Sequence, residues 1–190
     1  MAMISRAIVK SDWLNIASAD TTHDAMIDRM IDMVASEIEG ICNQPIESKA
    51  VTRYEIGNNR NSLLLPYTTA VTLSSVSSRS NPADSWVVAS GFYVWPTNAG
   101  YSLHSTDGFT EPYYKIELTA GYTVIPADIQ LCAYEMVKEV YYQTPFAAEA
   151  ERFGVSVIGE TDAGVAITKT IVQMRNRVKP RLERYIVHGV

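Results

Sequence analysis

The stretch TAGYTVIPADIQLCAYEMVKEVYYQ, Thr119 to Gln143, contains both kinds of regular secondary structure and a sharp boundary between them. Up to Thr123 it is typical of the end of a β-strand, and Gly121 suits a turn at that point. Pro126 supplies the fixed φ of a first helical turn, and Asp128 is an acid near the positive end of the helix dipole. The stretch therefore predicts a strand that turns directly into a helix.

The helix predicted from Pro126 onward is amphipathic and ends at Gln143-Thr144-Pro145. A second amphipathic helix of about five turns is predicted near the N-terminus. Thr21 is its expected N-cap, and Asn43 and Pro45 end it. A short helix over Ser11 to Ala17 is expected to precede it. The apolar stripes are Ile129, Cys132, Ala133, Met136 and Val140 in one helix, and Ile27, Met30, Ile31, Val34, Ile38 and Ile41 in the other.

Residues 50–122 consist of short β-like runs separated by turn-forming segments such as GNNRNS, SNPADS and PTNAG. Closely spaced strands without intervening helices indicate an antiparallel meander or a small barrel-like sheet. Tyr54 and Ile56, and then Ile116 and Leu118, alternate with polar neighbours. We expect them to be the half-buried side of their strands.

The chain after the second long helix has less regular patterns. Residues 144–167 hold three glycines, Gly154, Gly159 and Gly164, and no continuous helical period, which predicts an extended, mobile arm. A third helix is expected from Thr168, and Pro180 should kink or end it. The predicted fold class is therefore α+β, in a single domain over residues 1–190. It comprises a small helical bundle over 11–46 and 124–179, an antiparallel β insert over 50–122, the arm over 144–167 and a C-terminal tail over 180–190.

Composition places the chain among ordinary globular proteins, with 47% hydrophobic and 19% charged residues. A net charge of −5 argues against a dedicated nucleic-acid binder. The charge is segregated, because Asp12–Glu39 holds seven acids and one base, whereas Lys169–Arg184 holds six bases and one acid. Such segregation suits head-to-tail contact between proteins, and solvated helix faces produce it as well. No secretion signal or apolar run of membrane-spanning length is evident, so we expect synthesis in the cytosol.

Motifs for catalysis or metal binding are missing from the sequence. The histidines His23, His104 and His188 do not stand at ligand spacing, and Cys42 and Cys132 are expected to be buried free thiols. There is no glycine-rich phosphate loop, and Ser156 lies in GVSVIG, which does not match a nucleophile elbow. We therefore expect no enzymatic activity, no cofactor and no metal.

Aromatic residues are concentrated in the predicted β insert, and they leave two interpretations open. Rows of aromatic side chains on a sheet can stack on sugars or bases, but more often they form the core and cross-strand pairs. The basic residues near the C-terminus could contact phosphates, although a protein partner is the better interpretation. The aromatic residues are Trp86, Tyr93, Trp95, Tyr101, Tyr113 and Tyr114, and the basic ones are Arg175, Arg177, Lys179, Arg181 and Arg184.

Two separated motifs together resemble the head–tail connector proteins of tailed bacteriophages, also called head-completion or adaptor proteins. The first is the helix end EIEGICNQPI, and the second is the stretch from Thr119. The C-terminal Val178-Lys-Pro-Arg181 is similar to a third motif of that family. The resemblance covers residues 11–46 and 115–182. The matching residues are Ala35, Ile38, Glu39, Gln44 and Ile46, and then Thr119, Ala120, Gly121, Tyr122, Ile125, Pro126, Asp128, Ile129 and Ala133.

The resemblance implies a structural virion protein at the neck, made in the cytoplasm of the bacterial host. It would form a homo-oligomeric, dodecameric ring beneath the portal protein, bind a downstream neck or tail protein, and extend or gate a channel through which DNA passes without sequence-specific binding. The alternative is a small binding module whose aromatic sheet binds carbohydrate or another surface.

Three groups of residues are the expected contact sites of such a ring. No contact with a membrane is expected. The expected portal interface is Arg175, Arg177, Lys179, Arg181, Leu182, Arg184, Tyr185, Ile186 and Val187. The expected subunit interface is Asp24, Asp28, Asp32 and Glu39. The part of the arm expected to line the channel or contact a neighbour is Phe153, Val155, Val157, Glu160 and Asp162.

Overall fold

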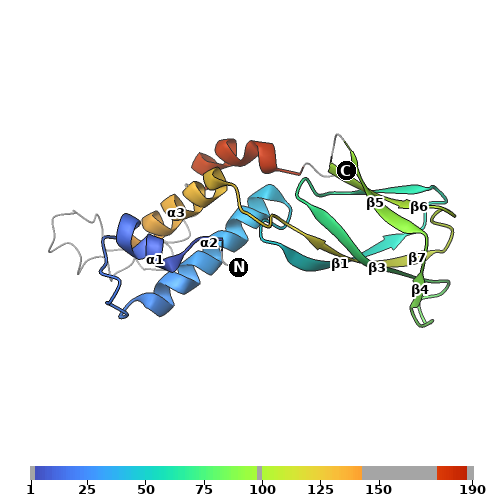
Figure 1. The fold of residues 1–190 in the computed structure, drawn as a ribbon, viewed down its shortest axis with the longest axis horizontal. Helices are drawn as coiled ribbons and strands as arrows, with labels where there is room; N and C mark the ends of the chain where they lie inside the picture. The colour runs from blue at the N-terminus through green and yellow to red at the C-terminus, as the bar shows by residue number, and fades with distance from the viewer. Residues whose placement is uncertain (1–2, 98–99, 143–174, 188–190) are drawn as a thin grey trace. The chain divides into compact units, whose positions relative to one another are not determined.

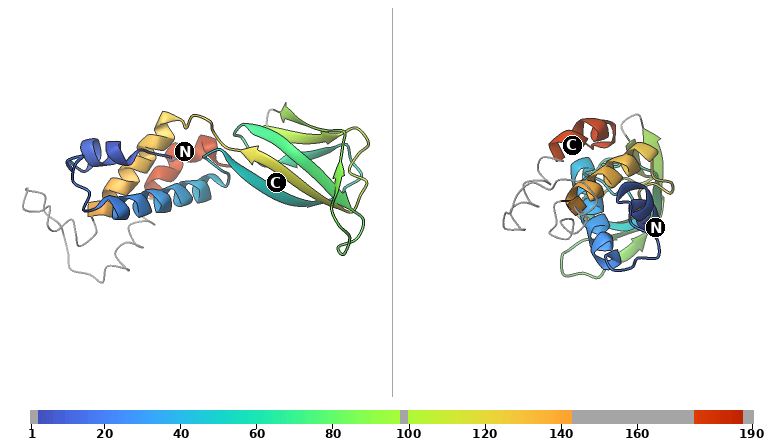
Figure 2. Two further views of the ribbon diagram at one scale, coloured as in Figure 1. Left: turned by 60° about the horizontal axis from the view of Figure 1, so that its bottom comes forward. Right: turned by 90° about the vertical axis from the view of Figure 1, so that its left-hand side faces the viewer.

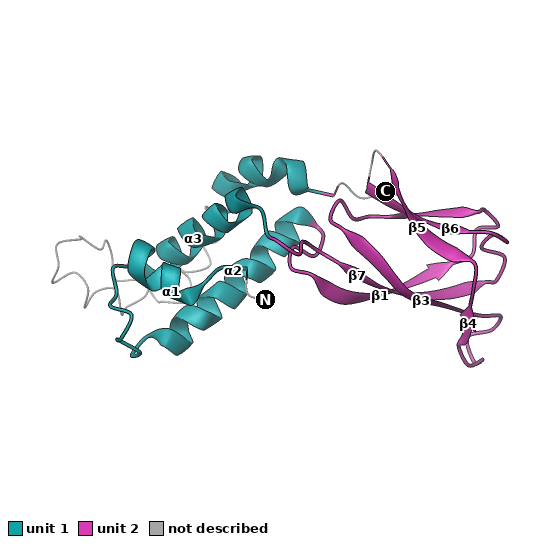
Figure 3. Ribbon diagram, in the orientation of Figure 1, with its two compact units in different colours: residues 1–42, 125–186 teal, residues 43–124, 187–190 magenta. Residues whose placement is uncertain are grey.

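The computed structural model describes residues 3–97, 100–142 and 175–187 (Figure 1). The chain divides into two compact units (Figure 3). Unit 1 comprises residues 1–42 and 125–186 and is helical, whereas unit 2 comprises residues 43–124 and 187–190 and contains the β-strands. The predicted α+β class, with an antiparallel β insert between helical segments, is confirmed. The predicted arm, 144–167, lies outside the described residues.

Unit 1 is built around two long helices that lie side by side in the views of Figures 1 and 2. Each buries the apolar stripe that its sequence period predicts, including Ile27 and Ile38 from one helix and Ile129 and Met136 from the other. The described helical elements of the unit are α1 (Arg6–Ile8), the π-helix η1 (Val9–Trp13), α2 (Asp24–Cys42), α3 (Ala127–Tyr142), helical residues 175–182 and the 3-10 helix η3 (Glu183–Tyr185).

Two helix starts differ from the sequence prediction. The N-terminal helix lies over residues 6–13 instead of 11–17, and Asn15, with φ of 54°, prevents its continuation. Helix α2 begins at Asp24, three residues after Thr21. The backbone N–H of Ile27 donates to the carbonyl of His23 at 2.9 Å, so His23 occupies the position that Thr21 was expected to take.

The loop between η1 and α2 is held by a buried lysine. Lys10 is almost completely buried, and its Nζ donates to the carbonyl oxygens of Ser18 and Asp20 and to Asp24 Oδ1, the last at 2.7 Å. An ammonium group has three protons to donate, so all of its hydrogen-bonding capacity is used. Burial of the charge is therefore compensated by its partners.

Unit 2 contains two antiparallel sheets among its described residues. In the larger sheet, β1 pairs with β7 and β7 pairs with β3. The strands are therefore not paired in sequence order, and the larger sheet is not a simple meander. The larger sheet has the order β1 (Lys49–Ile56), β7 (Tyr113–Ala120), β3 (Val71–Arg79) and β4 (Val87–Ala89). The smaller has the order β2 (Ser62–Leu65), β6 (Gly100–Ser105) and β5 (Phe92–Thr97).

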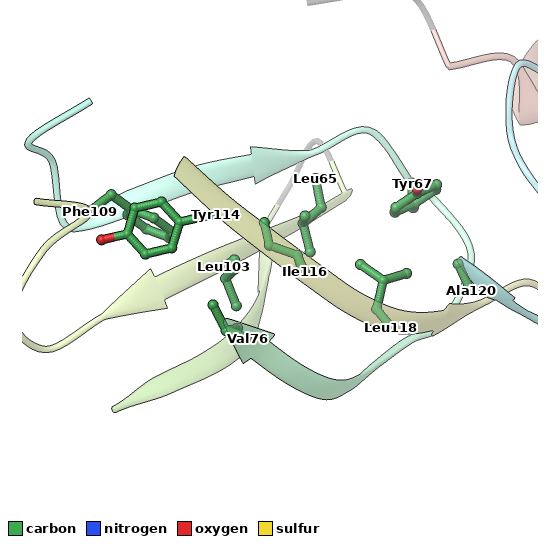
Figure 4. Packing of buried hydrophobic residues seen from close by; sticks show 9 residues of the cluster. All are labelled: Leu65, Tyr67, Val76, Leu103, Phe109, Tyr114, Ile116, Leu118 and Ala120. Carbon is green, nitrogen blue, oxygen red and sulfur yellow. The ribbon is translucent and has the colours of Figure 1, made fainter. Parts of the chain in front are cut away.

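The core of unit 2 lies between these two sheets (Figure 4). Val76, Ile116 and Leu118 come from the larger sheet, and Leu65 and Leu103 come from the smaller one. Successive side chains of a strand point to opposite faces, so each sheet has an inner face toward this core and an outer face away from it. The two outer faces therefore lie on opposite sides of unit 2.

The prediction for β1 was wrong about which alternate residues face the core. Ile116 and Leu118 of β7 are buried as expected, but Tyr54 and Ile56 are strongly exposed. Tyr54 is paired with Lys115 and therefore points to the outer face. The alternation along the strand was recognised correctly, but it does not say which of the two faces is covered.

The junction in the opening stretch depends on Gly121. Its φ is +125°, and a Cβ added there would lie 2.2 Å from the backbone oxygen of Glu47. The N–H of Tyr122 donates to the carbonyl of Ile46 at 2.8 Å, and Glu47 and Tyr122 form an isolated parallel bridge. The two motifs that resemble the connector family thus meet in space, and glycine is required where their backbones touch.

Candidate interaction surfaces

The C-terminal helical segment is attached to α3 by three ion pairs. Arg177 pairs with Glu139, Arg181 with Glu135 at 2.5 Å, and Arg184 with Asp128. The arginines ascend in sequence while the acids descend, so the segment runs antiparallel to α3. Arg175 adds a pair with Glu37 of α2 at 3.6 Å.

The last of these pairs belongs to a small hydrogen-bonded cluster. Tyr185 Oη donates to Asp128 at 2.7 Å, and Arg184 donates to Tyr185 Oη at 2.6 Å. Burial acts to raise the pKa of Asp128, but hydrogen bonds from Tyr185 and Arg184 outweigh it and hold the pKa below its ordinary value. Asp128 is thus a charged anchor for the end of the chain.

The C-terminal segment is more closely integrated than a separate tail. The helix continues through Pro180 to residue 182, whereas the sequence predicted a kink or an end there. Leu182 and Val178 are fully buried, and Tyr185 and Val187 are nearly so. The expected portal interface therefore divides into these buried anchors, half-buried Ile186, and the exposed basic side chains Arg175, Arg177, Lys179, Arg181 and Arg184.

The acids expected at the subunit interface are partly paired within the chain. Asp24 is bound by Lys10 and by Arg6, and Asp28 accepts from Arg6 at 2.6 Å. Asp32 is exposed, and Glu39 is half-buried. The residues expected in the arm, Phe153, Val155, Val157, Glu160 and Asp162, lie outside the described residues.

A groove of about 610 Å³ lies in unit 1 between η1, α3 and the C-terminal helix. Its described lining mixes both signs of charge, with Glu135, Lys138 and Arg177, and two aromatic residues, Trp13 and Tyr142. Trp13 stacks on Tyr134 with ring centroids 5.6 Å apart. Glu135 and Arg177 are already in ion pairs. Among the described lining residues there is no nucleophile next to a base.

The aromatic residues of the β insert divide between the core and the surface. Tyr114 is buried, whereas Tyr54, Tyr93 and Trp95 are exposed. The expectation of a core role is therefore confirmed for Tyr114, and the exposed aromatic residues lie on the outer faces. Tyr54 and Ile56 were not predicted as surface residues, and the pairing of Tyr54 with Lys115 identifies their face.

Within the described residues there is no group of three or more histidine, cysteine or acidic side chains that could hold a metal ion. Cys42 and Cys132 are free and buried, and burial raises the pKa of the Cys42 thiol to about 12. In the same part of the chain, none of the helices has both the length and the apolar character needed to cross a membrane.

Comparison with known proteins identifies a family and two structures of similar fold. No curated protein matches the chain in sequence. A solved structure, the neck of an empty GTA particle (a phage-like gene transfer agent) with C6 symmetry, contains a chain of similar fold, with a TM-score of 0.62 and 16% identity, covering 99% of this chain and 91% of that one. The neck of a native GTA particle with C12 symmetry contains another, with a TM-score of 0.55 and 15% identity, covering 100% and 94%.

At these identities the two structures establish a shared fold. The family model described as head completion protein matches residues 4–177, which is most of the chain. The match includes both long helices, all of the described strands and the start of the C-terminal helical segment. The chain therefore belongs to the head completion protein family.

Proposed function

We propose that this protein forms a ring in the neck of a tailed-phage particle, beneath the portal, where it connects the head to the tail and extends the DNA channel. The observation that carries the proposal is the family match over residues 4–177. The fold shared with chains of GTA necks that have sixfold or twelvefold symmetry supports a ring. Rings of identical subunits form when a head-to-tail contact closes on itself.

The exposed basic side of the C-terminal helix is the proposed portal contact. Arg175 and Lys179 are both exposed and stand four residues apart, which places them on one side of the helix. Leu182 and Tyr185 support that helix from beneath, because they are buried. This modifies the docking hypothesis drawn from the sequence, since the helix presents its charged side while its apolar residues remain in the core.

The remaining contacts of the ring are proposed as follows. Asp32 and Glu39 of α2 face a neighbouring subunit. The segment 144–167 contacts a neighbour or the channel, and DNA passes through without sequence-specific contacts. A chain of net charge −5 suits this passage, since binding to phosphates needs cationic contacts.

Assembly of particles without this protein tests the proposed function. We expect DNA-filled heads and complete tails that remain separate, and we expect purified protein to restore their joining. Normal joining in the absence of the protein would contradict the proposal.

The portal contact has its own test in a binding measurement. Substitution of Arg175→Glu together with Lys179→Glu should weaken binding to the purified portal at least tenfold, because both charges are reversed. Arg60→Glu, at an exposed position in unit 2, is the matched control and should bind as the wild type does. Equal affinity of all three proteins would exclude this side of the helix as the contact.

A further inference from the structure

The outer face of the larger sheet exposes three large side chains that are apolar or aromatic, two on β1 and one on β4 at the opposite edge. Tyr54 is 67% exposed, Ile56 is 74% exposed and Val88 of β4 is 76% exposed. Tyr54 pairs with Lys115, Ile56 with Tyr113 and Val88 with Ser77, which places all three on the face away from the core. We call this surface the Tyr54 face.

An arginine near two aromatic rings is part of the Tyr54 face. The guanidinium of Arg79 lies 4.3 Å from the ring centroid of Trp86 and 5.8 Å from that of Tyr113. Trp86 in turn lies 5.8 Å from Tyr54. These residues and Ile56 line a hollow of about 200 Å³. Tryptophan, tyrosine and arginine are the residues most enriched at interface hot spots, and a preorganised group of them suits a protein partner.

The outer face of the smaller sheet carries a second exposed apolar row. Leu64 and Trp95 pair with Ser102 from either side, so the three residues form a line across β2, β6 and β5. Tyr93 stacks on His104 with ring centroids 5.5 Å apart. These two residues pair with each other and lie two residues along their strands from Trp95 and Ser102, on the same face. Trp95 is 60% exposed and Tyr93 is 49% exposed. We call this surface the Trp95 face.

The two faces lie on opposite sides of unit 2, since the core separates the two sheets. Clustered exposed apolar residues indicate a binding surface, and here one compact unit carries two. A closed ring needs two different surfaces on each subunit, placed so that one meets the other on the next copy. The Tyr54 face and the Trp95 face meet that requirement.

We propose that the Tyr54 face of one subunit packs against the Trp95 face of the next, so that the β units form a head-to-tail contact around the ring. The inference rests on the proposed ring and adds the surfaces that close it. The most exposed side chains of both faces are apolar or aromatic, and the Tyr54 face also carries the Lys115–Glu117 ion pair. Removing the apolar surface from water stabilises the contact. A second copy of this chain is thus the occupant of each face.

Two single substitutions test the contact, because each one breaks a different face. Ile56→Asp disrupts the Tyr54 face, and Trp95→Asp disrupts the Trp95 face. Both positions are exposed, so unit 2 should keep its fold, as circular dichroism and thermal melting will show. Val124→Asp is the matched control, since Val124 is an apolar residue of unit 2 that is 81% exposed and lies outside both faces.

Sedimentation velocity over a concentration series gives the readout. The wild type and Val124→Asp should form closed rings, whereas each face variant should need at least a tenfold higher concentration to do so. An equal mixture of the two face variants should stop at dimers, because each variant retains one intact face and only one pairing is possible. This behaviour is specific to a head-to-tail contact.

Other outcomes overturn the inference in distinguishable ways. If the wild type and both face variants form rings at the same concentration, these faces are not the contact between subunits. The proposed function would not be affected by that result. Assembly lost in only one variant would indicate a face that pairs with itself or binds another ligand such as a glycan. A wild type that stays monomeric at every concentration would contradict self-association through these faces, and the particle-joining experiment would still decide the proposed function.

Discussion

At the scale of single residues, Gly121 shows how one position connects the family motif to the fold. It lets the strand turn while its backbone touches that of Glu47, so the requirement is both conformational and steric. We predict that Gly121→Ala lowers the free energy of unfolding by roughly 2 kcal/mol or more, because positive φ and a backbone clash combine. Urea unfolding provides the measurement.

Gly40 is the internal control for that prediction. It lies within α2, is exposed, and a Cβ added there would have no neighbour within 4 Å. Gly40→Ala should therefore stabilise the protein by about 0.5–1 kcal/mol, since alanine favours the helix. Equal effects of the two substitutions would show that Gly121 does not have the role assigned to it.

Cys42 allows a second prediction at this scale. Burial raises the pKa of its thiol to about 12, so at pH 8 the reactive thiolate is scarce and shielded. We expect Cys42 in the native protein to react with a disulfide reagent roughly 1,000-fold more slowly than a free thiol. In guanidinium chloride both cysteines should react fully. Rapid modification of Cys42 in the native state would contradict its buried position.

At the scale of elements, the C-terminal helix is held mainly by buried apolar residues and less by its ion pairs. Leu182 is fully buried, whereas Arg181 and its partner Glu135 are partly exposed. Leu182→Ala should cost about 2–5 kcal/mol, whereas Arg181→Ala should cost less than about 1 kcal/mol. Denaturant unfolding in low and high salt measures the free energy of unfolding of both variants. In high salt, only the arginine variant should become as stable as the wild type. The reverse order of costs would mean that the ion pairs hold the helix.

The Asp128–Tyr185 cluster predicts a pH dependence of the same element. The pKa of Asp128 is lower in the folded state than in the unfolded one, so its contribution to stability is present above the ordinary aspartate pKa. That contribution is lost as the pH falls through the lower, folded value. Asp128→Asn should therefore destabilise the protein at pH 7, and the difference from the wild type should shrink below about pH 4. A difference that stays constant down to pH 3 would contradict the assignment.

Local patterns predicted the elements well where one face alone is buried. The apolar stripe of α2, from Ile27 to Ile41, is buried as its period requires, and β7 alternates as expected. The phase of β1 could not be predicted, because the half-buried side of the strand carries Arg53 and Glu55 as an ion pair while Tyr54 is exposed. The helix does not end at Pro180, because burial of Val178 and Leu182 keeps it together on both sides of the proline.

At the scale of the whole molecule, part of the charge that is segregated in the sequence forms ion pairs within the chain. Much of the basic C-terminal segment is neutralised by acids of α3, and Asp24 and Asp28 are neutralised by Lys10 and Arg6. The contacts that we propose between copies therefore use the outer faces of unit 2, where Tyr54 and Trp95 are exposed. No local sequence pattern could have shown this, because ion pairing and exposure are properties of the folded chain.

The central claim is that this 21.1 kDa chain assembles into a closed ring. Native mass spectrometry of the wild-type protein, alone and on the purified portal, tests it most directly. We expect a single assembled species with six or twelve copies of the 21.1 kDa chain, matching the symmetries of the structurally similar necks. A chain that remains a monomer in both samples, or that forms dimers and no larger species, would contradict it.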